Sequence, residues 1–324
     1  MIETIRIYES DGVDPYRNLA IEQHLLETVE GGCCLLYLWQ NERTVVIGKN
    51  QNAWAECRTT LLIEEGGRLA RRLSGGGAVY HDLENLNFTF LMREEDYDLD
   101  RQLSVIQTAC ETLGVRTERS GRNDLLASGR KFSGNAFYHH EGRAYHHGTL
   151  LIRTDRDAMS RYLSPSKAKL EAKGVESVRA RVVNLSELSP VVTVQSLKTA
   201  LKSAFSKVYG LPVSSPPVLR EARVRELTAH YASDAWLFGQ KLPFTFRCES
   251  RFSWGGVEVQ LSVNEGVITG AKIYTDDMDD GLADKLKAAL CGCPFSLAAI
   301  ASRLNEQSLP HAADLIKMFT EQEI

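Results

Sequence analysis

Apolar and polar positions follow two different periods along the first fifty residues. Residues 5–8 alternate with a period of two, which predicts a strand, whereas apolar positions between 19 and 29 recur at helical spacing. Two apolar runs, 34–40 and 44–51, are separated only by the polar triplet 41–43. Such a short polar segment between two apolar runs predicts a β-hairpin. The chain is therefore expected to begin as strand, helix and hairpin.

Both periods continue through the rest of the chain. Strand-like patterns are found in two pieces within 78–92, in short pieces within 118–152, and again at 244–275. Helical patterns are found at 53–67, 101–114, 155–188, 196–209 and 220–240, and along the tail from 281. Sheets and helices are thus expected in both halves of the chain.

The order of these elements predicts an α+β fold, in which mixed β-sheets carry packed helices. A length of 324 residues favours two domains over one. The segment 211–218, LPVSSPPV, has the clearest linker composition in the chain. We expect a first domain over 1–245, on which the stretch 220–240 packs, and a small α/β accessory domain over 246–324.

Composition narrows the function classes. The formal net charge is −4 and the sequence pI is about 6.1, which argues against a broad electrostatic grip on nucleic acid or on an acidic membrane. The chain has neither an N-terminal apolar signal region nor a run long enough to span a bilayer. Its seven cysteines lack the paired spacing of a zinc site. We expect a soluble, cytoplasmic protein without a nucleic-acid or membrane partner.

The segment 71–82, RRLSGGGAVYHD, carries the strongest chemical signal. Three successive glycines can present backbone N–H groups to an anion, or let a ligand chain lie against bare backbone. The preceding arginines offer guanidinium forks for carboxylate or phosphate, and we expect one of them to face the site. A tight turn is the alternative for the glycines. The P-loop and dinucleotide fingerprints are absent, so a nucleotide must bind by another route.

Two later stretches add polar groups. Lys131, between glycine-containing turns, can direct its ammonium to a reacting centre, although the nearby Asn and Asp residues are ordinary turn-capping types. His146 and His147 lie in a predicted strand, so their side chains should point to opposite faces. The segment 164–181 has a surplus of three positive charges and reads either as a solvated helix face or as a loop that closes over phosphates.

These motifs together resemble the lipoate-protein ligase A family of the biotin/lipoate ligase superfamily, in its two-domain bacterial form. The resemblance rests on PYRNLAIE, RRLSGGGAVYHDLEN, GRNDLLASGRKFSGNA, HHGTLL and KLEAKGVESVRARVVNL, in this order. It covers 1–245, and RFSWGGVEVQL resembles the start of the accessory domain. The resemblance implies that lipoate is activated with ATP and Mg²⁺ to lipoyl-AMP and then transferred to one lysine of a lipoyl domain of a 2-oxoacid dehydrogenase, or of the glycine-cleavage H protein.

The resemblance also implies the site residues. Lys131 is the implied catalytic residue, bridging the acyl carbonyl and the α-phosphate, and Asp124 is the implied Mg²⁺ ligand. The implied lipoate-binding residues are Glu22, Arg72, Ser74, Gly75, Gly76, Gly77 and His147. The implied ATP and adenylate residues are Val79, Asn85, Asn123, Asp124, Lys131, Ala136 and Thr149, with apolar Val79 also bordering the acyl chain.

Other interpretations stay open at this point. A lipoyl or octanoyl transferase would take a preformed acyl donor, although the motif stretches lack the cysteine that thioester transfer needs. A biotin ligase would show a different glycine and arginine loop, and a non-catalytic binder would have no use for Lys131. Glu84 stands where the family motif usually has glycine, which questions adenylation in particular. A monomer is expected.

Overall fold

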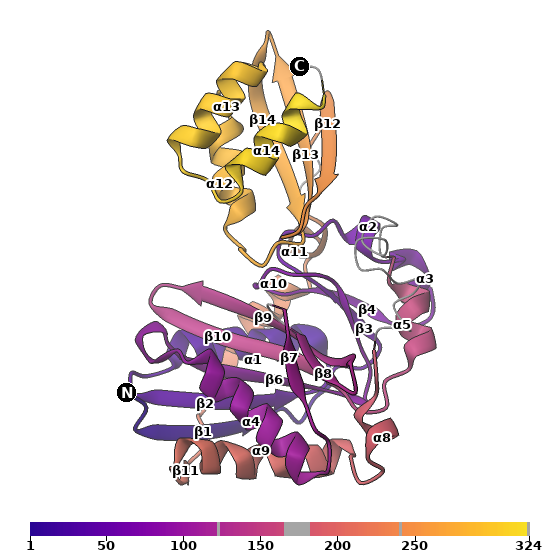
Figure 1. Cartoon of the computed structure of the whole chain (residues 1–324), viewed down its shortest axis with the longest axis vertical. Coiled ribbons are helices and arrows are strands. Elements are labelled where there is room, and N and C mark those ends of the chain that lie inside the picture. Colours follow the sequence, from indigo (N-terminus) through magenta and orange to yellow (C-terminus); the bar gives the residue numbers. More distant parts are fainter. Residues whose placement is uncertain (122–123, 165–181, 240–241, 323–324) are drawn as a thin grey trace.

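The computed structural model describes residues 1–324 except 122–123, 165–181, 240–241 and 323–324. Its largest element is an eight-stranded sheet, which crosses the lower unit of the molecule (Figure 1). In spatial order the strands are β11 (Val213–Ser214), β1 (Thr4–Glu9), β2 (Cys33–Trp39), β6 (Asn85–Arg93), β10 (Arg143–Leu151), β9 (Arg130–His140), β8 (Asp124–Ala127) and β7 (Glu118–Ser120).

The sheet is mixed, as predicted. Strand β1 runs parallel to both β11 and β2, and every pairing from β2 to β7 is antiparallel. The register places His147 between Thr89 on β6 and Ala136 on β9, and Thr149 beside Asn87. Residues that share one face of these central strands therefore come from segments far apart in the sequence.

A second sheet of three strands lies beside the first. It has the order β4 (Arg68–Arg71), β3 (Thr44–Ile47) and β5 (Val79–His81). The predicted hairpin of 34–40 with 44–51 is therefore wrong, because β2 pairs with β1 and β6 while β3 pairs with β4 and β5. Hydrophobic alternation identifies strands but does not identify their partners.

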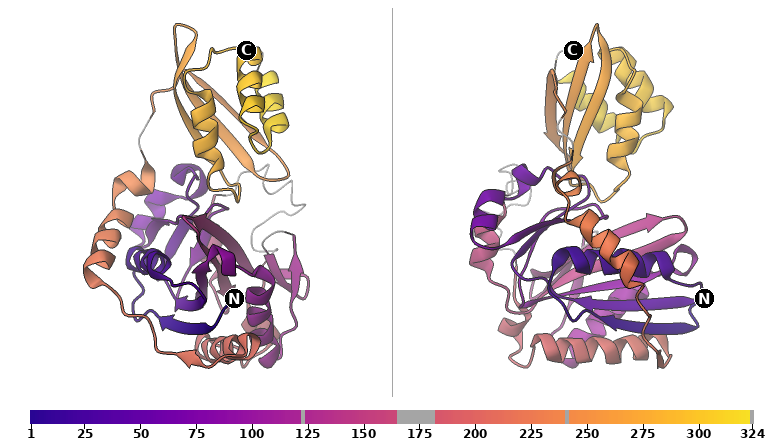
Figure 2. Two further views of the ribbon diagram at one scale, coloured as in Figure 1. Left: turned by 90° about the vertical axis from the view of Figure 1, so that its left-hand side faces the viewer. Right: turned by 180° about the vertical axis from the view of Figure 1, so that it is seen from behind.

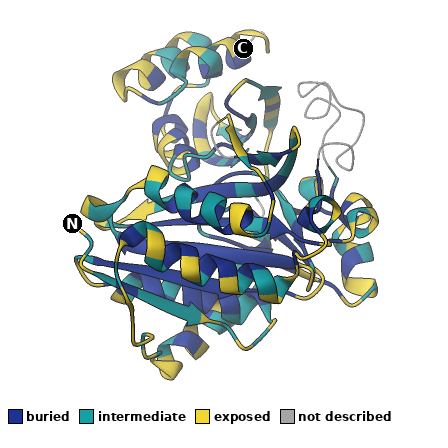
Figure 3. Cartoon of the chain, turned by 60° about the horizontal axis from the view of Figure 1, so that its bottom comes forward, coloured by how far each residue is buried: buried dark blue, intermediate teal, exposed yellow. Residues whose placement is uncertain are grey.

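Helices cover both faces of the large sheet. Figure 3 shows dark blue strands behind helices whose outer sides are yellow. Helices α4 (Leu99–Thr112) and α9 (Val194–Tyr209) pack on the face that carries Phe88 and Phe90. Helices α1 (Pro15–Thr28) and α10 (Glu221–Tyr231) pack together, and their apolar residues join Tyr37 and Tyr145 in a separate core. The site described below lies on this second face.

Several shorter helices complete the first unit. The predicted helix over 53–67 is divided into α2 (Ala53–Glu56) and α3 (Thr59–Glu64), because Cys57 has extended backbone and bridges to Leu163. The remaining short helices are η1 (Glu94–Asp96), α5 (Arg156–Tyr162), α8 (Leu185–Leu188) and α11 (Asp234–Phe238).

Local sequence explains where the long helices begin and end. The Asp14 carboxylate accepts hydrogen bonds from the N–H groups of Tyr16 and Arg17, and Pro15 occupies the first helical turn of α1. Thr193 caps α9 through the N–H of Ser196. Gly210 ends α9 in the left-handed conformation, with φ of 66°, which glycine adopts without steric cost.

The C-terminal unit has its own core (Figure 2). Strands β12 (Phe246–Arg251), β13 (Gly256–Asn264) and β14 (Val267–Thr275) form an antiparallel meander. Helices α12 (Leu282–Leu290), α13 (Leu297–Glu306) and α14 (Ala312–Thr320) bury their apolar residues against it. The observed architecture confirms the predicted α+β class with a C-terminal α/β unit. No helix among the described residues is long and apolar enough to cross a membrane.

Replacement of Phe90 by alanine tests the core of the large sheet. Phe90 is fully buried against the rings of Phe88, His146 and Phe205. The substitution should lower the free energy of unfolding in urea by about 3–5 kcal/mol, because the surroundings cannot fill the vacated volume. Phe244→Ala, at a residue that is 46% exposed, is the matched control and should cost less than about 1 kcal/mol. Equal losses would contradict this assignment of the core.

Candidate functional site

The loop of residues 74–77, called here the glycine loop, is held by one arginine. The Arg72 side chain donates from Nε to Ser74 Oγ at 3.0 Å and from Nη2 to the carbonyl oxygens of Gly75 and Gly77 at 2.7 and 2.8 Å. Its Nη1 donates to the Val46 carbonyl at 3.2 Å. Because the loop carbonyls turn toward the guanidinium, Arg72 sets the curvature of the loop.

Arg71 has a different task. Its guanidinium donates to the carbonyls of Lys49 and Gln51 at 2.8 and 2.7 Å, and to those of Trp236 and Leu237 in α11. It therefore ties the segment before the C-terminal unit to the loop after β3. Of the two arginines, Arg72 is the one beside the glycine loop.

Both guanidiniums are buried without an ion pair to any carboxylate among the described residues. Burial lowers the pKa of Arg71 and of Arg72 to about 10, which still leaves both side chains protonated at neutral pH. A buried cation without a paired anion raises the local potential. The buried carboxylate of Glu22 acts on Arg72 in the opposite sense to burial, so the two charges of this cluster partly offset each other.

A buried chain of hydrogen bonds connects the glycine loop to α1. Ser74 Oγ lies 2.8 Å from His147 Nε2, and His147 Nδ1 lies 2.9 Å from Glu22 Oε1. Because Ser74 already accepts from Arg72, its hydroxyl can donate to His147, which then carries its own hydrogen on Nδ1 and donates to Glu22. Four residues predicted to bind lipoate are thus brought together by direct contacts.

The series of buried hydrogen bonds has a second branch at Glu22, which was not predicted from the sequence. Thr89 donates to Glu22 Oε1 at 2.7 Å and accepts a hydrogen bond of 3.0 Å from Trp39 Nε1. Asn85, Asn87 and Thr89 are polar residues at every second position of an otherwise apolar strand, which places them on one face. That alternation could have identified Asn87 and Thr89 together with the predicted Asn85.

The two asparagines have unused hydrogen-bonding capacity. Both are buried, and Asn85 Nδ2 donates to Asn87 Oδ1 at 2.8 Å. Asn85 Oδ1 and Asn87 Nδ2 have no partner among the described residues. Because an unpaired buried polar atom is costly, this acceptor and this donor are suited to a polar ligand or an ordered water.

Lys131 lies on β9, the strand that neighbours β10 on the side away from β6. Its Nζ lies 2.6 Å from Asp124 Oδ1, and both side chains remain about one third or less exposed. The lysine side chain crosses Gly134, whose N–H donates to Thr149 Oγ1 at 3.3 Å. The predicted adenylate residues Asp124, Lys131 and Thr149 are therefore neighbours, and Ala136 lies opposite His147 in the register.

The remaining predicted residues are placed as follows. Val79 is half-buried on β5, and it packs on the core that contains Tyr37 and Tyr145. Asn123 and the basic segment 165–181 lie outside the described residues. Glu84 is exposed, and its backbone carbonyl accepts from the N–H groups of Ile152 and Arg153.

The C-terminal unit contacts the glycine loop directly. The Gly76 N–H donates to the Asp277 carbonyl at 2.9 Å, and a Cβ at position 75 would lie 2.4 Å from that same oxygen. A Cβ at position 76 would lie 3.0 Å from Met278 Sδ. Bare backbone in this loop is therefore required for protein packing as well as for any ligand. Sequence reasoning considered only a ligand or a tight turn.

Metal-binding groups are sparse at the site. The described residues contain no group of three or more His, Cys, Asp or Glu side chains that could hold a metal ion. Asp124 contributes one carboxylate, and Mg²⁺ in nucleotide sites commonly takes one or two protein carboxylates while phosphates and waters supply the rest. Asp124 fits that pattern as a single ligand, although one of its oxygens already contacts Lys131.

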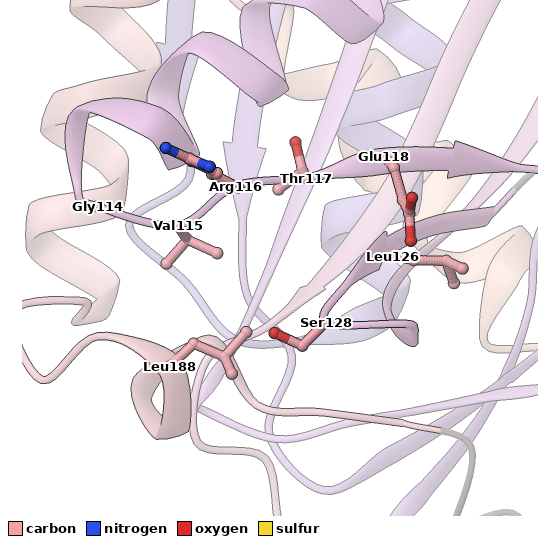
Figure 4. A pocket seen from close by; sticks show the side chains of 8 residues that line it. All are labelled: Gly114, Val115, Arg116, Thr117, Glu118, Leu126, Ser128 and Leu188. Carbon is pink, nitrogen blue, oxygen red and sulfur yellow. The ribbon is translucent and has the colours of Figure 1, made fainter.

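A surface hollow lies between strands β7 and β8, the segment that follows α4, and helix α8 (Figure 4). It has a volume of about 500 Å³ and is lined by Arg116, Thr117, Glu118 and Ser128 together with apolar residues such as Leu188. None of the predicted site residues lines it. The contacts that link Arg72 to His147, and Lys131 to Asp124 and Gly134, identify the candidate site better than this concavity does.

The chain belongs to the lipoyl protein ligase family. The lipoyl protein ligase A/B catalytic domain matches residues 14–206, and the bacterial lipoate protein ligase C-terminus matches residues 241–323. The catalytic-domain match spans more than half of the chain. The fold and the two family matches therefore place the chain in this family, with a catalytic domain followed by a C-terminal domain.

Solved structures agree with this assignment. LipL1 of P. falciparum, solved in complex with lipoate, is 28% identical, with 94% of each chain covered and a TM-score of 0.81. A bipartite lipoate protein ligase of Thermoplasma acidophilum, described with its E2 lipoyl domain, is 26% identical over 76% of this chain and 100% of that chain, with a TM-score of 0.65. A lipoate-protein ligase A bound with ATP is 26% identical over 74% and 99%, with a TM-score of 0.64.

Replacement of Arg72 by lysine tests its hold on the glycine loop. A lysine keeps the positive charge but cannot reach four acceptors with a planar fork, so buried carbonyls lose their partners. We expect the free energy of unfolding to fall by about 2 kcal/mol. Arg68→Lys, at an exposed position two strand residues before Ala70, is the control and should change little. If both variants unfold at the same urea concentration as the parent chain, Arg72 does not organise the loop.

The buried His146 predicts a dependence of stability on pH. Desolvation lowers its pKa from 6.5 to about 3, so in the folded chain it stays neutral between these values while the unfolded chain takes up a proton. Stability should therefore decrease as pH falls below 6.5, with this one histidine contributing a slope of about 1.4 kcal/mol per pH unit.

His146→Gln removes that titration. Urea unfolding between pH 6 and pH 4.5 should show a shallower slope in this variant by about that amount. His140→Gln, at a side chain that is 61% exposed, should keep the parent slope. An unchanged slope in His146→Gln would contradict the assignment of a neutral buried imidazole.

Proposed function

We propose that this chain is a lipoate-protein ligase that catalyses two consecutive steps. In the first, a lipoate carboxylate oxygen attacks the α-phosphorus of ATP, which forms lipoyl-AMP and releases pyrophosphate. In the second, a lysine amine of the acceptor protein attacks the lipoyl carbonyl, which forms an amide and releases AMP. The acceptors are lipoyl domains of 2-oxoacid dehydrogenases and the glycine-cleavage H protein. Neither step requires a covalent acyl-enzyme.

The observation that carries this proposal is that two cations reach neighbouring positions of β10. Arg72 is linked through Ser74 to His147, and Lys131 crosses Gly134, whose N–H donates to Thr149, two residues further along the same strand. Both steps develop negative charge on oxygens next to the acyl carbon and the α-phosphate. Positioned cations in a site that is partly shielded from water stabilise that charge more strongly than the same groups in bulk solvent.

The roles proposed for individual residues are those that the family motifs imply. Glu22, Arg72, Ser74, Gly75, Gly76, Gly77 and His147 are proposed to border the lipoyl group, and Val79, Asn85, Asn123, Asp124, Ala136 and Thr149 are proposed to surround the adenylate. The unpaired Asn85 Oδ1 and Asn87 Nδ2 supply one acceptor and one donor for its polar atoms. Lys131 is proposed to contact the reacting oxygens in both steps.

Related solved structures support the proposed substrates. Lipoate and ATP are bound in related structures, and a lipoyl domain accompanies the bipartite ligase. Magnesium is proposed to arrive with the ATP phosphates, where it neutralises charge on the triphosphate; Asp124 is the carboxylate available to it. A cytoplasmic location and a monomeric state are part of the same proposal.

Transfer from a preformed acyl donor is the second candidate. A thioester route needs an activated cysteine. The cysteines of the first unit, Cys33, Cys34, Cys57 and Cys110, are all buried. Burial raises the pKa of Cys110 and of Cys57 to about 12, so neither thiol is activated for nucleophilic attack. These observations favour the ligase over a transferase that works through a cysteine.

Replacement of Lys131 by alanine tests the catalytic proposal. Loss of the ammonium removes charge stabilisation in both steps, so the rate of lipoylation should fall by at least about 10²-fold. The measurement is mass spectrometry of a purified lipoyl domain after incubation with the full chain, lipoate, ATP and Mg²⁺. Lys207→Ala, at an exposed position of α9, is the control and should modify the domain at the parent rate. A parent-like rate of lipoylation in Lys131→Ala would contradict the proposed catalytic role of Lys131.

A further inference from the structure

We propose that Asp124 is a positioning residue, which holds the Lys131 ammonium above Gly134 in the arrangement that acyl transfer requires. The inference rests on the proposed ligase function and adds a role to it. Asp124 acts through Lys131, and its contribution is therefore to the geometry of the catalytic cation.

The contact is direct and is built by the register of two strands. Asp124 is paired with Gly134 across β8 and β9, and Lys131 is paired with Leu126 beyond a bulge. The bulge lies between Leu125 and Leu126. Lys131 Nζ reaches back along the strand to Asp124 Oδ1 at 2.6 Å. A β-bulge commonly redirects a side chain near a functional site, and here it allows the two charged groups to meet.

Gly134 forms the floor under this ion pair. A Cβ at position 134 would lie 2.8 Å from Lys131 Nζ and 3.0 Å from its Cε. Such contacts are too short, so any side chain at this position would push the end of the lysine aside. The absence of a side chain at 134 and the carboxylate of Asp124 thus restrict the same ammonium from two directions.

The benefit of this restriction is positional. A lysine side chain carries its compact ammonium on a flexible four-carbon stem, so without a contact to hold it the ammonium would sample many positions. The pair is about one third exposed, and pairs of this kind add little to folding stability. Catalysis is more sensitive, because a displacement of about 1 Å in a catalytic group can cost roughly 10²-fold in rate. Loss of Asp124 should therefore reduce rate more than stability.

This role differs from that of a metal ligand in a testable way. Mg²⁺ is needed where the triphosphate of ATP must be neutralised, whereas transfer from preformed lipoyl-AMP involves no triphosphate. A metal-binding Asp124 would affect only the first step and its Mg²⁺ requirement. An Asp124 that positions Lys131 would affect acyl transfer with no metal present.

The experiment is single-turnover transfer from synthetic lipoyl-AMP to a purified lipoyl domain, in the presence of EDTA, with the full chain. Asp124→Asn and Gly134→Ala are each expected to lower the transfer rate by about 10- to 100-fold at saturating lipoyl-AMP. The dissociation constant for lipoyl-AMP should change less than the rate. Asp124→Glu keeps a carboxylate and should recover part of the loss.

Asp100→Asn provides the matched control. It removes another ion pair of the same unit, between Asp100 and Arg119, which is more exposed and does not include Lys131. This variant should transfer at the parent rate. If it slowed as much as Asp124→Asn, a general electrostatic effect would replace the positioning role.

Other results would overturn the proposal. Parent-rate transfer by Asp124→Asn in EDTA, together with a higher Mg²⁺ requirement in the ATP-dependent reaction, would make Asp124 a metal ligand only. If Asp124→Asn failed to fold, parent-rate transfer by Gly134→Ala would be sufficient to overturn it. Failure of the parent chain itself to transfer the lipoyl group would instead refute the proposed function, which makes the two failures distinguishable.

Discussion

The candidate site depends on the buried guanidinium of Arg72. It donates to the Ser74 hydroxyl and to the carbonyls of Gly75 and Gly77 within the glycine loop, so it holds the loop in its observed curvature. The same contacts begin the buried chain through Ser74 and His147 to Glu22, which places a formal positive charge at one end and a carboxylate at the other. One interaction therefore orders the loop, orients the histidine and anchors helix α1 on the sheet.

The glycine loop also joins the two units of the molecule. Its Gly76 N–H is bonded to the Asp277 carbonyl, and Asn50, which follows β3, exchanges further contacts with the backbone of Thr275 and Asp280. Any ligand that uses the Gly76 amide must replace the bond to Asp277. A ligand that used this amide would therefore compete with the packing of the C-terminal unit on the loop.

Much of the fold could be predicted because its signals are local. The long helices and most strands follow from periodicity and caps, and the opposite orientation of His146 and His147 follows from strand geometry. His146 faces Gln102 and Asn135, whereas His147 faces Glu22 and Ser74. Strand pairing was less accessible, since β2 and β3 are neighbours in sequence and members of different sheets. Periodicity contains no information about the partner of a strand.

In the site, too, residues in local motifs could be predicted, whereas contacts between distant segments could not. Family motifs named Arg72, Ser74, His147 and Lys131, and the structure brings the first three into one hydrogen-bonded chain with Glu22. Trp39 was missed because it is an ordinary apolar residue of its strand until the register is known, whereas the polar alternation of 85, 87 and 89 was a local signal for Asn87 and Thr89 that the motifs did not use. The contacts of Gly75 and Gly76 with Asp277 and Met278 join positions about two hundred residues apart, which no local pattern could reveal. The binding roles of the predicted residues stay predictions.

Exchange of labelled pyrophosphate into ATP measures adenylation, the first of the two proposed steps. The purified chain should catalyse exchange only when lipoate and Mg²⁺ are present, because only the reversible formation of lipoyl-AMP returns pyrophosphate to ATP. Exposed Glu84 should not prevent it. Transfer from synthetic lipoyl-AMP without any lipoate-dependent exchange would contradict the account and would make the chain a transferase that depends on an adenylate formed elsewhere.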